Sequence, residues 1–188
     1  MSDASWVLDP QALASGSASL ELWTEKEGVL ARAAHDLCLR AQEATVSLSP
    51  EGQLEVAVEV KSLRVAGQVK RGQIKPLSAK DHAEIESNLQ SAAVFDAARF
   101  PRVTYRGTCV LSEGRARVTG ELELRGQRRP LALTGSWRLD GQDAIASGDV
   151  RLRQSAWGVK PYSALLGAIK VKDELRVSWS LRLRRADA

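Results

Sequence analysis

The side chains best suited to acid–base or metal chemistry are two histidines, His35 and His82. A catalytic zinc site needs about three protein ligands, and neither "AAHDL" nor "KDHAE" has the spacing of a two-histidine motif. His35 and Asp36 resemble two members of a Ser-His-Asp triad, but neighbouring residues on a strand point to opposite faces. The chain also lacks a G-x-S-x-G motif. We therefore predict no enzyme activity, no metal and no cofactor, with both histidines in structural or surface roles.

The two cysteines, Cys38 and Cys109, are predicted to be reduced thiols. Cys38 is out of phase with Leu37 and Leu39, whereas Cys109 is in phase with apolar neighbours such as Tyr105. Thiols on opposite faces are poor partners, because a disulfide requires Cβ atoms within about 4.5 Å.

The charge pattern argues against nucleic acid as a partner. The net charge is +4, and the excess comes largely from the arginines of "RGQRRP" and "LRLRRADA". A nucleic-acid surface would interleave such charges with stacking aromatics, and none of the aromatic residues lies among these arginines. The arginines are expected on solvated strand faces.

Strict alternation of apolar and polar residues marks segments 54–60, 118–124, 131–139 and 175–183 as half-buried antiparallel strands. Weaker strand patterns and turn signals lie between them. Together they predict an all-β fold, a closed barrel or a sandwich. At this length the simplest organisation is a single domain over 1–188.

One segment breaks the alternation. Residues 79–92 have helical spacing of apolar side chains, Ser78 is placed to cap the helix, and a further turn over 94–98 ends before Pro101. We expect this helical insert, about 79–98, to cover one opening of the sheet structure.

The predicted interior contains small residues at Gly107, Gly120 and Gly135. A barrel of about eight strands is just wide enough to be filled by side chains or to hold one small ligand. Inward glycines favour a cavity. The alternative is a solid core in which the glycines mark bulges or bends.

The chain resembles the YceI-like family, the lipocalin-like barrels associated with polyisoprenoid binding. The segments that carry the resemblance are "GVLARAAHDLCL", "FDAARFP" after the helical insert, "GELELRGQRRPLAL" and "VRLRQSAWGVKPYSALLGAIKVKDELRVSWSL". They span nearly the whole chain and are most similar to the branch without a leader. The resemblance implies an extended, up-and-down antiparallel β-barrel of about eight strands with helices at one opening. It also implies a deep apolar cavity for a long amphiphile, such as an isoprenoid quinone or a prenyl diphosphate.

The segment 158–172, "GVKPYSALLGAIKVK", is expected at the rim of that barrel, either as the lip of a cavity or as a plug. Its lysines are candidates for contact with an anionic head group. The strand phase and this segment give a set of candidate cavity residues. These candidates are Phe95, Phe100, Tyr105, Leu133, Trp137, Trp157, Tyr162, Leu165, Leu166, Ile169, Val177 and Trp179, with Lys160, Lys170 and Lys172 for the head group.

Three functions follow from these features. The favoured one is non-enzymatic binding, transport or sequestration of a hydrophobic small molecule or lipid, such as an isoprenoid quinone, a prenyl lipid or a fatty acid. The second is an interaction or stress-response module with a filled barrel, acting through its basic last strand and an exposed Trp23. The third is a hydrolase or isomerase with His35 as its base. Homodimerisation is compatible with the first two.

No signal peptide is visible at the N-terminus, and no apolar run approaches the ~18 residues of a membrane span. The expected location is therefore the cytoplasm, or the periplasm if a leader has been removed.

Overall fold

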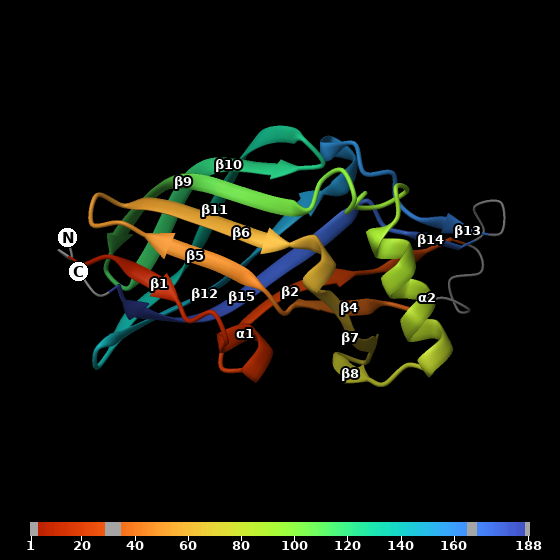
Figure 1. The fold of residues 1–188 in the computed structure, drawn as a ribbon, viewed down its shortest axis with the longest axis horizontal. Coiled ribbons are helices and arrows are strands. Elements are labelled where there is room, and N and C mark those ends of the chain that lie inside the picture. Colours follow the sequence, from red (N-terminus) through yellow and green to blue (C-terminus); the bar gives the residue numbers. More distant parts are fainter. Residues whose placement is uncertain (1–3, 29–34, 165–168, 187–188) are drawn as a thin grey trace.

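A computed structural model describes residues 4–28, 35–164 and 169–186 of the 188-residue chain. Its main element is a closed barrel of antiparallel strands, each paired with the next (Figure 1). In spatial order these strands are β1 (Trp6–Leu8), β5 (Ala44–Leu48), β6 (Gln53–Glu59), β9 (Arg102–Ser112), β10 (Arg115–Leu124), β11 (Gln127–Asp140), β12 (Asp143–Arg153) and β15 (Glu174–Arg185). The predicted antiparallel eight-stranded barrel is confirmed.

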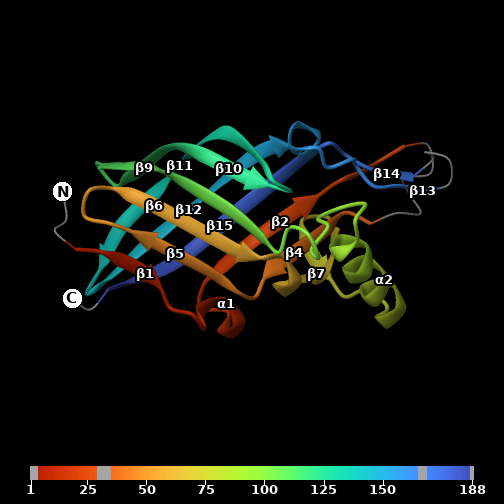
Figure 2. The same cartoon turned by 45° about the horizontal axis from the view of Figure 1, so that its top comes forward.

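The barrel closes only along part of its length, because β15 is shared between two partners. Its C-terminal residues pair with β1, through Leu183↔Leu8. Its N-terminal part pairs instead with β2 (Ser19–Thr24), through Trp179↔Leu20 and Val177↔Leu22. The sheet then continues through β4 (Leu37–Ala41), β7 (Leu63–Lys70) and β8 (Gln73–Lys75). This extension, which splays away from the barrel (Figure 2), was not part of the sequence prediction.

Two segments of the chain connect the barrel to the extension. One runs from β4 into β5 with only Gln42 and Glu43 between them, and the other runs from β6 through the short 3-10 helix η2 (Val60–Ser62) into β7. The buried Ser62 joins the two crossings: its hydroxyl donates to the Glu59 carbonyl at 2.7 Å and accepts from the Glu43 amide at 3.1 Å. Both segments therefore bend at the same level, where the barrel opens.

The remaining elements lie around the open end or beside the first strand. The helix α1 (Ala12–Ser15) connects β1 to β2 and ends at Gly16 in the left-handed conformation. A 3-10 turn, η3 (Gln154–Trp157), follows β12. A small second sheet is formed by β3 (Lys26–Glu27), β13 (Ser163–Ala164) and β14 (Ile169–Val171).

The predicted helical insert forms α2 (Ala79–Gln90), which lies beside β7 at the splayed end (Figure 1). The predicted cap is confirmed, since the Ser78 hydroxyl accepts a hydrogen bond from the Asp81 amide at 3.1 Å. None of the side chains of α2 is fully buried. Its side chains bond the β7 backbone: Glu86 accepts from the Val65 amide at 3.0 Å, and His82 Nε2 lies 2.7 Å from the Val65 carbonyl. His82 thus has a structural role at this contact.

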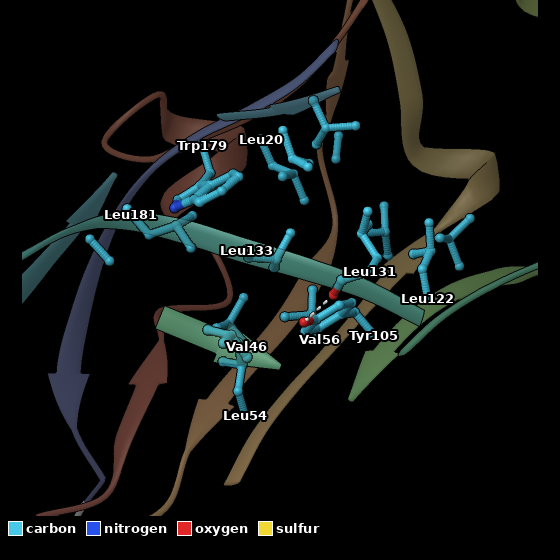
Figure 3. Close-up of a pocket in the computed structure, with 18 of the residues that line it drawn as sticks. Leu20, Val46, Leu54, Val56, Tyr105, Leu122, Leu131, Leu133, Trp179 and Leu181 are labelled. Carbon is cyan, nitrogen blue, oxygen red and sulfur yellow. Dashed lines mark hydrogen bonds between the residues drawn. The ribbon is translucent and has the colours of Figure 1, made fainter. Parts of the chain in front are cut away.

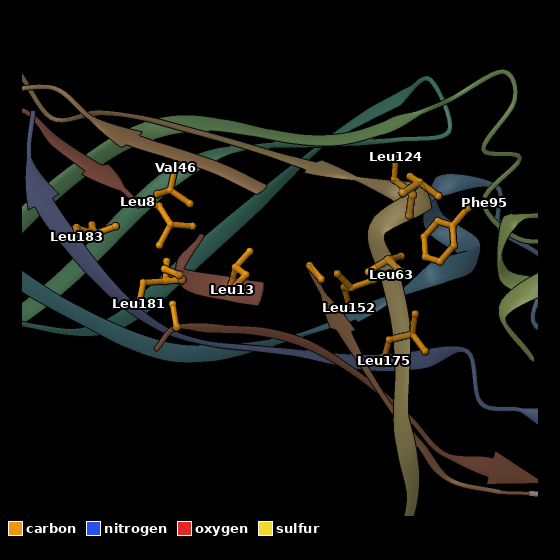
Figure 4. Close-up of a cluster of buried hydrophobic side chains, with 14 of the residues drawn as sticks. Leu8, Leu13, Val46, Leu63, Phe95, Leu124, Leu152, Leu175, Leu181 and Leu183 are labelled. Carbon is orange, nitrogen blue, oxygen red and sulfur yellow. The ribbon is translucent and has the colours of Figure 1, made fainter. Parts of the chain in front are cut away.

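Buried apolar side chains, most of them leucines, form two groups along the barrel (Figure 4). We call the group at the closed end the floor cluster; it contains Leu8, Leu13, Val46, Leu181 and Leu183. The group where the barrel opens is the neck cluster; it contains Leu63, Phe95, Leu124, Leu152 and Leu175.

The outer faces carry the charges that the alternation assigned to solvent. Arg182 on β15 lies between Asp140 and Asp143, with both ion-pair distances at 2.8 Å, and Arg151 pairs with Glu174 at 2.8 Å. Cross-strand pairs of this kind contribute little individually. They nevertheless show that the arginines lie outside the barrel.

Two sequence expectations need correction here. Trp23 is half-buried rather than exposed, because its indole donates to the Ser178 hydroxyl at 2.9 Å and the Arg176 guanidinium lies 4.9 Å from its ring centre. Cys38 is fully buried despite being out of phase with its leucine neighbours, since β4 is covered on both faces. Both cysteines are free thiols, as predicted.

The floor cluster predicts a stability difference between two leucines near the closed end. Leu183 is 2% exposed and Leu139 is 59% exposed. Leu183→Ala should lower the free energy of unfolding by about 2–5 kcal/mol through lost burial and a cavity. Leu139→Ala should change it by no more than about 0.5 kcal/mol. Urea denaturation of both variants measures this, and equal losses would contradict the assigned floor.

Candidate functional site

Between the floor and neck clusters the barrel holds a cavity of about 250 Å³, which we call the inner chamber. Its walls are apolar side chains from the barrel strands and β2, pointing inward as the alternation predicted (Figure 3). Examples from opposite walls are Val56 and Leu133. The interior of the barrel is therefore only partly filled by its own side chains.

The inner chamber stays open partly because a tyrosine lies against a glycine. A Cβ atom at Gly120 would lie 2.7 Å from the Tyr105 hydroxyl oxygen, so only glycine leaves room for this ring. The hydroxyl donates to the Leu131 carbonyl at 2.9 Å (dashed in Figure 3), and burial raises the pKa of Tyr105 to about 12. The polar end of Tyr105 is thus satisfied by the wall.

Trp179 is accommodated in the same way. Its ring rests on the cross-strand pair Gly135↔Gly148. A Cβ atom at Gly148 would lie 2.5 Å from Cζ2 of that ring, and one at Gly135 would lie 3.3 Å away. Two inward glycines therefore act as a slot for a large aromatic side chain, which lies along the wall instead of crossing the chamber.

Towards the floor, Trp137 lines the chamber and packs edge-to-face on the buried Trp6, with ring centres 5.8 Å apart and an interplanar angle of 82°. Aromatic pairs favour this geometry. Cys109 also lines the inner chamber, and burial raises the pKa of its thiol. A protonated thiol is a weak nucleophile, so Cys109 behaves as an apolar wall residue.

A second cavity of about 310 Å³, the outer chamber, lies under α2 at the splayed end. Its walls are mostly apolar, but unlike those of the inner chamber they include several charged and polar side chains. Asp81, Glu84 and Asn88 come from α2, and Lys26, His35 and Lys170 come from the opposite side. The Thr24 hydroxyl on this wall is buried and has no hydrogen-bond partner among the described residues.

The candidate cavity residues divide among four locations. Phe95, Tyr105, Leu133, Trp137, Val177 and Trp179 line the inner chamber. Phe95, Tyr162 and Lys170 line the outer chamber. Leu165 and Leu166 lie outside the described residues, as does the side chain of Ile169, whose backbone belongs to β14. Phe100, Trp157, Lys160 and Lys172 are described but line neither chamber.

Three of the four candidates that line neither chamber make structural contacts elsewhere in the protein. Phe100 packs over Gly126, where a Cβ atom would lie 2.9 Å from its ring. Trp157 is buried, and its indole donates to the Leu122 carbonyl at 2.9 Å. Lys172 forms an ion pair with Glu25 at 2.6 Å, which raises the pKa of Lys172 and lowers that of Glu25.

The sequence interpretation missed the polar wall of the outer chamber. Asp81, Glu84 and Asn88 have the i, i+3, i+7 spacing of one helical face, which was a usable signal. Nothing in the sequence, however, identified the strands that this face would meet.

The histidines show no catalytic arrangement in the parts of the chain that the structure describes. His35 lies in the outer chamber, and the neighbouring Asp36 carboxylate accepts from the Lys26 amide at 2.8 Å. No group of three potential metal ligands is found over 4–28, 35–164 and 169–186. Within the same ranges, neither helix is long and apolar enough to span a bilayer.

A closed antiparallel barrel with an apolar lumen and a helix over its open end defines a lipocalin-like fold. Within that class the chain belongs to the YceI-like domain family, whose model matches residues 6–183. The predicted family is therefore confirmed.

Solved structures and curated proteins agree with this assignment. A polyisoprenoid-binding domain from Saccharophagus degradans superposes with a TM-score of 0.68 at 11% identity, covering 97% of this chain and 99% of that one. BcnA from Burkholderia cenocepacia gives a TM-score of 0.66 at 15% identity, covering 93% and 98% of the two chains. A UPF0312 protein from Vibrio cholerae is 29% identical over 92 residues, 45% of this chain and 49% of the relative. The chain thus spans about half the length of the curated relatives it matches.

The Trp179 slot generates a stability prediction. Gly148→Ala should cost about 1–3 kcal/mol of stability by overpacking against the indole ring. In a Trp179→Leu background the same change should cost measurably less, giving a coupling of at least about 0.5 kcal/mol. Urea denaturation of the four proteins completes the cycle. If the two changes are simply additive, Gly148 does not hold the ring.

Proposed function

We propose that the protein binds a lipid with a long apolar chain, holding the chain in the inner chamber, and that it acts by binding without catalysis. The main support for this proposal is the inner chamber itself, a cavity of about 250 Å³ with almost wholly apolar walls. Burial of apolar surface contributes roughly 25 cal/mol per Å², so a chain in such a cavity needs no polar contact to bind.

The alternative of a filled barrel that acts through its surface has less support. A filled barrel would place side chains across the lumen, whereas Tyr105 and Trp179 lie back against glycines. The polyisoprenoid-binding description of the Saccharophagus relative agrees with a lipid ligand. We therefore propose carriage or sequestration of an isoprenoid-like amphiphile.

The head group is proposed to be polar but uncharged, as in an isoprenoid quinone or alcohol. The outer chamber places two carboxylates, Asp81 and Glu84, opposite two ammonium groups, Lys26 and Lys170. A diphosphate there would meet like charge as well as opposite charge and would lose its hydration. A neutral head could instead bond Thr24 and Asn88 without that cost. This proposal differs from the lysine-based head-group site expected from the sequence, of which Lys170 lines the outer chamber.

Matched alanines test whether the inner chamber binds the chain. Ala146 on β12 lines the chamber, whereas Ala132 on β11 is exposed on the outer face. Ala146→Phe should weaken binding of geranylgeraniol by about tenfold or more by filling the lumen, and Ala132→Phe should leave it unchanged. The affinity of each variant is measured by titrating geranylgeraniol and following the fluorescence of the chamber tryptophans. Equal affinities in the two variants would place the lipid elsewhere.

The head-group assignment is tested with two ligands that share one chain. The protein should bind geranylgeraniol more tightly than geranylgeranyl diphosphate. The double change Asp81→Asn and Glu84→Gln should raise affinity for the diphosphate by about tenfold and leave the alcohol nearly unchanged. Glu121→Gln on the outer wall serves as the control. Tighter binding of the diphosphate to the unaltered protein would contradict a neutral head group.

A further inference from the structure

Phe95 lies where the two chambers meet. Its side chain lines both of them, as do Leu22, Leu124 and Leu175. Phe95 is only 8% exposed and belongs to the neck cluster (Figure 4). The four side chains therefore form the partition between an almost wholly apolar space and one with mixed apolar and polar walls. Of the four, Phe95 alone comes from a loop, since the others belong to strands β2, β10 and β15.

We propose that Phe95 is the gate of the binding site: a lipid chain reaches the inner chamber from the outer chamber only when this ring moves aside. The proposal rests on the proposed lipid-binding function and assigns its entry route. At the opposite end the route is blocked, because the floor residues Leu8 and Leu183 are almost completely buried and Trp6 packs behind them.

Backbone hydrogen bonds of Phe95 and the residue after it hold the gate in position. The Phe95 amide donates to the Leu89 carbonyl in the last turn of α2 at 3.1 Å. The next residue, Asp96, has a φ of +50° and donates from its amide to the Ser91 carbonyl at 2.8 Å. Aspartate is among the few residues that tolerate this left-handed conformation. Phe95 therefore sits at a fixed turn directly attached to the helix.

Arg125 clamps the same turn from the barrel side. Its guanidinium donates to the Val94 carbonyl at 2.9 Å and to the Ala92 carbonyl at 3.2 Å. Arg125 lies in the β10–β11 turn, with a φ of +51°. The "RGQRRP" segment that the sequence singled out as basic thus includes a side chain that positions the gate.

The gate can open by a local movement, because α2 is attached to the sheet only through partly buried side chains. None of its side chains is fully buried. Ile85 and Leu89 pack against the buried Leu37, Leu39 and Val65, and His82 and Glu86 contact the Val65 backbone. Segments with few buried contacts open locally more easily than the core of a protein. When α2 moves and the two Arg125 hydrogen bonds to the turn break, the Phe95 turn moves with the helix and the two chambers join into one tunnel.

A joined tunnel selects for a particular shape of ligand. A molecule that fills both chambers needs an apolar chain to pass the neck and a polar end that stays outside it. Once the chain has passed, the ring closes beside it and slows its release. Phe95 is therefore expected to govern the rates of entry and release.

Cys109 provides a test that needs no lipid. Its side chain lines the inner chamber and is half-buried, whereas Cys38 is fully buried. Phe95→Ala should accelerate alkylation of Cys109 by N-ethylmaleimide about tenfold, the effect of a ~1.4 kcal/mol lower opening cost. Phe95→Trp should slow it. Phe100→Ala is the matched control: it removes the same ring from the same loop but from a residue that lines neither chamber.

Release of geranylgeraniol, followed by tryptophan fluorescence, gives the second readout. Faster release from Phe95→Ala, with Phe100→Ala unchanged and thermal melting confirming that each variant is folded, supports the gate. If geranylgeraniol binds, but the rate of its release and the rate of Cys109 alkylation are each the same in all variants, the gate is wrong and the proposed function stands. If geranylgeraniol does not bind to any variant, the proposed function fails, while the alkylation rates still decide whether Phe95 controls access. Alkylation at one rate in all variants overturns the gate in that case too.

Discussion

The division of β15 between two partners is the constraint on which the rest of the structure depends. Where β15 pairs with β1 the barrel closes, and where it pairs with β2 the sheet splays towards β4, β7 and α2. Backbone groups in a buried sheet must find partners, so this exchange of strands fixes where the lumen ends. The floor cluster, the neck cluster and both chambers follow from it (Figures 1 and 4).

An open lumen opposes the usual tendency of interiors to pack closely. The protein keeps the space by placing its large rings on glycines in the barrel wall, Tyr105 over Gly120 and Trp179 over Gly148. The rings still gain contact with the wall, and the centre stays free for a ligand. An apolar cavity costs stability, so filling it would add to the binding energy of the lipid that we propose. Relatives at 11–15% identity keep the same fold, although a shared fold does not fix the ligand.

The lining of the inner chamber was predictable from the sequence. Strand alternation places Tyr105, Leu133 and Trp179 on the inward faces of their strands, whichever strands pair with one another. The helix and its Ser78 cap were predictable for the same reason, since both are local patterns. The outer chamber was not predictable: Lys26, His35 and Asp81 meet only because the sheet splays, and that depends on pairings between segments far apart in the chain. Phe100 and Trp157 line neither chamber, since aromatic character alone does not tell on which side of a loop a ring packs.

Lipid carriage by this protein is best tested by native mass spectrometry of the protein purified from its own host, before and after lipid extraction. We expect one amphiphile per chain, visible as a discrete added mass that is lost on denaturation and restored by incubation with an isoprenoid quinone or alcohol. A bare polypeptide mass that persists after incubation with isoprenoid quinones, isoprenoid alcohols and fatty acids would contradict it.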